Sequence, residues 1–196
     1  MFADINQHIN VVWQSIGVVV GSLALLSLAE KNIIPIDVSF SLIVILIGWM
    51  AANLIDSSYW YNRNLVIIAN IERQFLEQND LKEIHYYFGA HRPKNKMITH
   101  LKVQMYLGIA IAVLILLYHF YERVSPGFCL PIEFFEPLRT LPYLVTTVCI
   151  VALLKLQKKK SSDYNEFIRN SPGKAIDATS VSYGPGHGFP KPREPN

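Results

Sequence analysis

Acidic and basic residues are missing from the middle of four stretches of this sequence, and that absence is its most informative feature. The stretches comprise residues 11–29, 38–55, 103–121 and 141–156. Each is close to the length of about 20 apolar residues that crosses a hydrocarbon core of about 30 Å as a helix. Residues 42–47 and 109–117 also lack the polar stripe that a surface helix of a soluble domain shows at helical spacing. The sequence therefore predicts an all-α membrane protein with four spans.

Signals for cleavage, disulfide bonding and catalysis are scarce as well. The first ten residues contain no lysine or arginine, so we expect no cleaved secretory signal and a first span that stays in the protein. Of the two cysteines, Cys149 falls inside the fourth apolar stretch, so a disulfide with Cys129 is not expected. The chain has no P-loop, no Gly-x-Ser-x-Gly and no glycine-rich dinucleotide turn.

Three histidines, His85, His91 and His100, lie in the connection between the second and third stretches. They lack the spacing of three or four residues that metal sites on helices use, and neither cysteine nor a pair of carboxylates joins them. We therefore predict no catalytic residue, no cofactor-binding residue and no metal site, and we expect no nucleic-acid partner. The protein is predicted not to be an enzyme.

The spans also lack an ionisable residue near mid-membrane, and they lack the broken helix pairs of inverted-repeat transporters. Both absences disfavour a secondary transporter. A channel stays open as an alternative, because Ser, Thr or Asn side chains can line a pore once several copies assemble.

Lysine and arginine are concentrated in two segments, the connection after the second stretch and the segment after the fourth. The other two connections are poor in them, with Lys31 in the first and Arg123 and Arg139 in the second. The positive-inside rule then places the two basic segments in the cytoplasm. We expect a multi-pass protein of the inner (plasma) membrane with both termini cytoplasmic, as an even number of spans requires.

This topology divides the chain into four parts. We expect a transmembrane hairpin over residues 1–55, a cytoplasmic helical segment over 56–100, a second hairpin over 101–157, and a basic and then disordered tail over 158–196. The three lysines at the start of the tail, Lys158, Lys159 and Lys160, are predicted to contact lipid headgroups. The lipid bilayer is thus the first predicted partner.

The cytoplasmic segment has apolar residues at helical spacing over residues 59–78. We predict that this helix, continuous with the second span or separate from it, contacts a cytoplasmic protein, a sister subunit or the membrane surface. Its contact residues are Tyr61, Leu65, Ile68, Ile71 and Phe75. A short helix over residues 81–88 should follow, because Asp80 and Glu83 have the spacing of a capping box.

Small residues recur four apart in three of the spans and predict close helix packing. The pairs are Gly17 with Gly21, Gly48 with Ala52, and Gly108 with Ala112. Packing of this kind serves either a tight bundle or an oligomer, and we expect a homo-oligomer.

Two predicted spans are followed by the run Asn64-Leu65-Val66-Ile67-Ile68 and then by the pair Ile71-Glu72. The run and the pair fall within residues 38–78. This region resembles small bacterial membrane proteins of the SLATT and RipA-like kind. The resemblance implies an oligomeric membrane assembly, linked in part to antiviral or stress systems. The leading hypothesis is a non-enzymatic oligomer, acting as a scaffold or as a gated membrane-permeabilising effector. A small-solute channel or carrier is the alternative, and a membrane-bound enzyme with an unrecognised site is the third.

Overall fold

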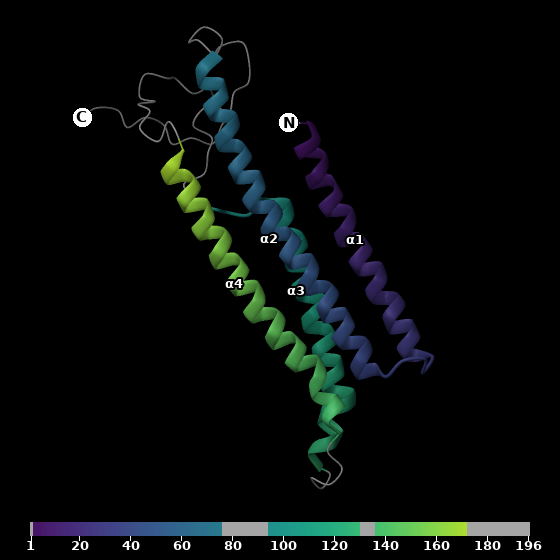
Figure 1. The fold of residues 1–196 in the computed structure, drawn as a ribbon. Coiled ribbons are helices and arrows are strands. Elements are labelled where there is room, and N and C mark those ends of the chain that lie inside the picture. Colours follow the sequence, from purple (N-terminus) through teal and green to yellow (C-terminus); the bar gives the residue numbers. More distant parts are fainter. Residues whose placement is uncertain (1, 76–93, 130–135, 172–196) are drawn as a thin grey trace, which may run out of the picture. The chain divides into compact units, whose positions relative to one another are not determined.

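The computed structural model describes residues 2–75, 94–129 and 136–171, and these residues form helices joined by short connections (Figure 1). The four long helices are α1 (Phe2–Glu30), α2 (Ile36–Phe75), α3 (Thr99–His119) and α4 (Leu141–Asn170). A π-helical turn, η2 (Phe120–Val124), and a 3₁₀ turn, η3 (Ser125–Cys129), follow α3, and a second 3₁₀ turn, η5 (Pro137–Thr140), leads into α4. Within these ranges there is no strand.

The predicted all-α fold with four long apolar helices is confirmed. Each of the four apolar stretches lies in one helix and its adjoining turn, and all four helices are long and apolar enough to cross a membrane. The predicted helix from residue 59 is the continuation of α2, because no helix-breaking residue follows Asp56. The predicted short helix over residues 81–88 and most of the predicted disordered tail lie outside the described residues.

The chain divides into two compact units. The first comprises Met1–Ser57 and Met97–Lys158, and the second comprises Ser58–Lys96 and Lys159–Asn196. In the first unit the helices alternate in direction, so that α1 and α3 run opposite to α2 and α4 (Figure 1). Both α2 and α4 continue from the first unit into the second.

A tight turn at Asn32 reverses the chain between α1 and α2. The N–H of Ile33 donates to the carbonyl of Leu28 (3.0 Å), and the N–H of Asn32 donates to that of Ala29 (3.0 Å). This pair of bonds forms a Schellman motif, which needs a left-handed residue, and Asn32 has a φ of 57°. Asparagine tolerates this conformation better than other non-glycine residues. The carbonyl of Pro35 then accepts from the first N–H groups of α2.

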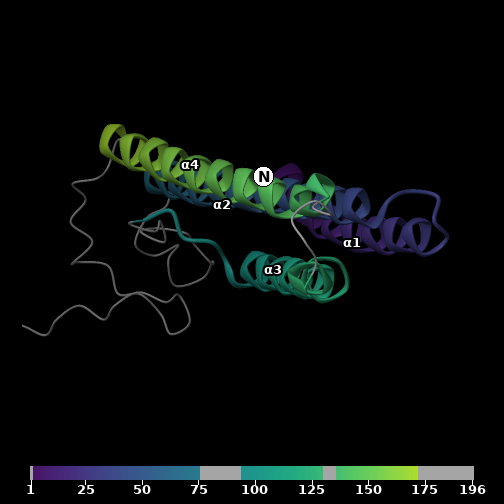
Figure 2. The same ribbon diagram turned by 90° about the horizontal axis from the view of Figure 1, so that it is seen from below.

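Helix α2 is the centre of the first unit and touches each of the other three helices. Its side chains Phe40, Ile43 and Leu54 are fully buried. Towards α3, Gly108 leaves room for Met50 and Ile47, and towards α4, Gly48 leaves room for Cys149. Leu46 lies against Gly21 of α1, and Figure 2 shows α1 and α4 alongside α2. Small residues thus sit at the contacts of α2 with its neighbours, as close helix packing requires.

The outward faces of the other helices of this unit carry many large apolar side chains. Large apolar side chains are exposed along α1, α3 and α4, among them Val20, Leu23, Val103, Leu107, Leu114, Leu117, Leu144, Val148 and Leu154. A soluble monomer rarely exposes contiguous apolar surface of this extent. The arrangement is compatible with a membrane protein.

Candidate functional site

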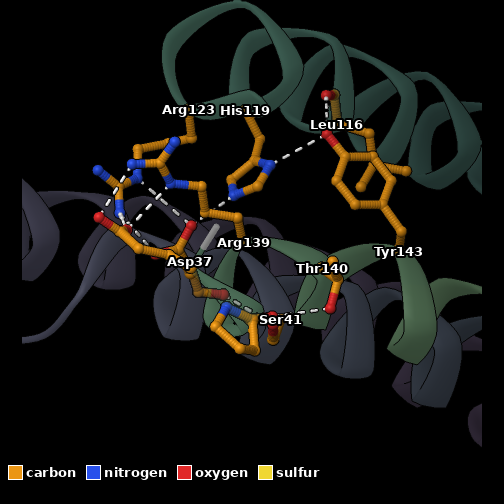
Figure 3. A network of polar contacts seen from close by, with 10 residues as sticks. Asp37, Ser41, Leu116, His119, Arg123, Arg139, Thr140 and Tyr143 are labelled. Carbon is orange, nitrogen blue, oxygen red and sulfur yellow. Dashed lines mark hydrogen bonds and ion pairs between the residues drawn. The ribbon is translucent and has the colours of Figure 1, made fainter. Parts of the chain in front are cut away.

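A network of polar side chains joins three helices at the end of the first unit where α2 and α4 begin and α3 ends (Figure 3). Asp37 lies in the first turn of α2, where an acidic side chain also favours the helix N-terminus. His119 is the last residue of α3, and Tyr143 lies in the first turn of α4. The alternating helix directions therefore bring together residues that are 82 and 24 positions apart.

His119 uses both ring nitrogens in this network. Its Nε2 lies 2.8 Å from Oδ1 of Asp37, and its Nδ1 lies 3.0 Å from the hydroxyl of Tyr143. Because a carboxylate only accepts, Nε2 carries a proton and donates to Asp37. In the neutral ring, Nδ1 then accepts from the Tyr143 hydroxyl. The exposed fractions of the His119 and Asp37 side chains are 0% and 1%, so water does not compete for these bonds.

Arg123 connects the buried part of the network to its exposed part. It follows His119 by four residues, so both side chains lie on one face of the chain. One guanidinium nitrogen, Nη2, lies 3.2 Å from Oδ2 of Asp37 and 3.0 Å from Oε2 of Glu136. Arg139 binds the same Glu136 carboxylate with two nitrogens: its Nε lies 3.0 Å from Oε2 and its Nη2 lies 3.0 Å from Oε1. The hydrogen bond from Arg139, with help from Arg123, lowers the pKa of Glu136 below its ordinary value.

The charges of this network balance when His119 is neutral, since two carboxylates face two guanidiniums. A buried carboxylate is costly unless it is paired and hydrogen-bonded, and Asp37 is both. The ring of Phe40 stands edge-on to His119, with centroids 5.5 Å apart. The arrangement can hold the ends of α2, α3 and α4 together, because Tyr143, His119 and Asp37 form a continuous line of hydrogen bonds between these helices.

Metal chemistry has no ligand set in the described part of the chain. No group of three or more His, Cys, Asp or Glu residues there is placed to hold an ion. Of the three histidines considered from the sequence, His85 and His91 lie outside the described residues, and His100 is exposed in the first turn of α3.

A second surface of interest lies on the part of α2 that belongs to the second unit. Among the predicted contact residues, Leu65 is buried, Tyr61 and Ile68 are half-buried, and Ile71 and Phe75 are exposed. The exposed apolar residues that share one face are spaced by four, and we call them the α2 stripe. They are Ile67, Ile71 and Phe75, with exposed fractions of 38%, 52% and 74%.

The other residues predicted from the sequence fall into three environments. Gly48 and Gly108 lie at helix contacts, whereas a side chain at Gly17 would meet nothing within 4 Å. Ala52 and Ala112 are half-buried. Lys158 and Lys159 are exposed, and Lys160 is half-buried with its Nζ 4.7 Å from the centre of the Tyr59 ring.

Sequence reasoning did not single out Asp37, His119, Tyr143 or Arg123 as a site. A usable signal existed, because the predicted alternation of spans already puts residues 37, 119 and 143 on one side of the membrane. Three polar residues at span ends on the same side are candidates for a shared network.

In its described part the chain is all-α, with four helices long and apolar enough to cross a membrane. No family model, curated protein or solved structure matches the chain.

Proposed function

We propose that this protein is a non-enzymatic scaffold of the plasma membrane whose α2 stripe binds a partner in the cytoplasm. The observation that carries the proposal is the exposure of Ile67, Ile71 and Phe75 on one face of α2, after the predicted span over residues 38–55. The partner is a cytoplasmic protein or a second copy of this chain. The proposal places four helices across the membrane and both termini in the cytoplasm.

The length of α2 supports this placement. Its 40 residues extend roughly 60 Å at 1.5 Å per residue, about twice the thickness of the hydrocarbon core. The roughly 20 residues from Ile55 to Phe75 alone extend roughly 30 Å. If residues 38–55 cross the membrane, the far end of α2 stands in water. The α2 stripe would then be an apolar face in an aqueous compartment.

The exposed apolar side chains of the stripe favour a protein partner. Full burial of one such side chain stabilises a contact by about 1.5–3 kcal/mol. The spacing of four residues is the pattern by which one helix lies in the groove of another protein. The polar network around Asp37 attaches the first turn of α2 to α3 and α4, and so holds the N-terminal end of the helix that carries the stripe.

Pore formation by a single chain has less support. The void between α1, α2 and α3 is lined by Ser15, Ser22, Gln104 and apolar side chains, and its volume is about 10 Å³. That is near the lower limit for one water molecule. The polar groups beside it are already engaged, since Ser15 bonds the Val11 carbonyl at 2.9 Å and Gln104 at 3.2 Å. A permeabilising effector or channel would need several copies, so we favour the scaffold.

Photo-crosslinking in cells tests the scaffold. A benzophenone amino acid replaces Phe75, which it resembles in shape, and a second variant carries it at Tyr106, an exposed aromatic residue of α3. We expect a defined protein adduct from position 75, none from position 106, and loss of the adduct when Ile71→Asp is added. Ser162→Asp, which puts the same charge on an exposed part of α4, is the matched control and should keep the adduct. Absence of an adduct from position 75 would refute the scaffold.

A further inference from the structure

The second unit contains a row of cations and aromatic rings that joins α2 to α4. Lys160 of α4 places its Nζ over the ring of Tyr59, and the Tyr59 ring stands edge-on to Trp60 with centroids 5.4 Å apart. The guanidinium carbon of Arg63 lies 4.9 Å from the centre of the Trp60 ring and 5.1 Å from that of Phe167. Arg63 is thus held between one ring from each helix, and its orientation is fixed by both.

Arg63 has no anionic partner in the described part of the chain. Its Nε is buried without a hydrogen-bond partner, and the ion pairs described above lie instead in the Asp37 network. Asp163 and Glu166 lie on the same stretch of α4, yet neither forms an ion pair with Arg63. The guanidinium is always charged and carries five donors in a planar fork. Contact with ring faces leaves the donors along its edge unused.

The second unit contains other positive groups besides this arginine. Lys159 and Lys160 belong to α4, and the connection before α3 holds Lys94 and Lys96. That connection is fixed against α2, because Asn62 Nδ2 donates to Asn95 Oδ1 at 2.8 Å and to the carbonyl of Lys96 at 3.0 Å. Three segments of the unit that contains Arg63 therefore carry positive charge. An anion is the ligand that this charge favours.

We propose that Arg63, flanked by Trp60 and Phe167 and assisted by Lys160, binds the phosphate of an anionic phospholipid headgroup. The inference rests on the proposed membrane placement, since Arg63 follows Asp56 by only seven residues in the same helix. Trp and Tyr side chains prefer the depth of the headgroups, and the site contains Tyr59 and Trp60. A phosphate accepts two parallel bonds from one guanidinium. A lipid offers that phosphate at the interface, whereas a free phosphate ion would come from solution.

The test uses the purified full chain in detergent and follows the fluorescence of Trp60. Trp13→Phe and Trp49→Phe remove the other two tryptophans of the chain. The probes are phosphatidylglycerol, phosphatidylcholine and inorganic phosphate. We expect saturable binding of phosphatidylglycerol at least tenfold tighter than that of phosphatidylcholine, with no competition from millimolar inorganic phosphate.

Variants at Arg63 and a matched arginine separate the site from general attraction of charge. Arg63→Gln should weaken phosphatidylglycerol binding about tenfold or more, and Arg63→Lys should recover only part, because it keeps the charge and loses the fork. Arg169→Gln removes an equal charge from an exposed position of α4 and should leave binding unchanged. Equal effects of Arg63→Gln and Arg169→Gln would overturn the site. Displacement of the lipid by inorganic phosphate would overturn its assignment to a lipid.

Failure of this inference is distinguishable from failure of the scaffold. A chain that enters detergent micelles and shows no preference for phosphatidylglycerol would reject the lipid site and leave the Phe75 adduct expected. A chain that stays soluble without detergent would reject the membrane placement on which both proposals rest.

Discussion

The buried pair of Asp37 and His119 should be the most expensive polar contact to break in the first unit. Asp37→Ala removes a carboxylate that bonds His119 at 2.8 Å and Arg123 at 3.2 Å. It leaves a buried imidazole and a guanidinium with half of its acceptors lost. Removing one partner of a buried ion pair lowers the free energy of unfolding by about 3–5 kcal/mol. Loss of an ordinary hydrogen bond lowers it by only about 1 kcal/mol.

Reversible unfolding in mixed micelles can measure this loss, with Glu136→Ala as the matched variant. Glu136 is more than half exposed and belongs to the same network, so its removal should lower the free energy of unfolding far less than Asp37→Ala does. The double variant Asp37→Ala with His119→Ala should lose less free energy of unfolding than the sum of the losses in the two single variants. We expect the difference, which is the coupling energy of the pair, to be about 1–3 kcal/mol. If Asp37→Ala costs no more than Glu136→Ala, the network does not hold the helix ends together and the reasoning is refuted.

Three further outcomes are expected. Gly17→Leu should leave the melting temperature of the chain unchanged, because nothing lies within 4 Å of that position, and should reduce the size of the detergent particle if α1 packs against a sister chain. Gly108→Leu, by contrast, should lower the melting temperature, since the new side chain meets Met50, at a cost of about 1–3 kcal/mol; equal melting of the two variants would contradict the helix contacts. Because the pKa of Glu136 is lower in the folded chain, its stabilisation is complete above the ordinary value of 4.5 and is lost as pH falls through the folded value. The melting temperature should therefore fall on acidification more in the wild type than in Glu136→Gln, and parallel pH profiles would exclude this contribution.

The four helices were predictable because absence of charge over about 20 residues is a strong local signal. The residues at which the helices begin and end were less predictable. Helix α1 begins at Phe2, well before the apolar stretch, because the polar residues there are compatible with a helix. Helix α4 likewise runs through the three lysines to Asn170, so the basic start of the tail is helical. Hydropathy marks where a helix can meet lipid and does not mark where its hydrogen bonding stops.

The polar network was harder to predict, since its members are far apart in the sequence. The alternation of spans places Asp37, His119 and Tyr143 at the same end, but contact also requires the rotation of each helix about its axis. Helix α3 is apolar all round over most of its length, so no amphipathic face indicates which side meets α2. The aromatic contacts of Arg63 were hidden for a similar reason, because Phe167 lies on a helix that could not be paired with α2 from the sequence.

The side of the membrane on which Phe75 of α2 and Leu138 of η5 lie tests the central claim most directly. Phe75→Cys and Leu138→Cys, both at exposed positions, are introduced into a chain carrying Cys129→Ser and Cys149→Ser. A maleimide that does not cross membranes is applied to intact and to permeabilised cells. The scaffold with cytoplasmic termini predicts labelling of position 138 in intact cells and of position 75 only after permeabilisation. Labelling of position 75 in intact cells, or of both positions from the same side, would contradict it.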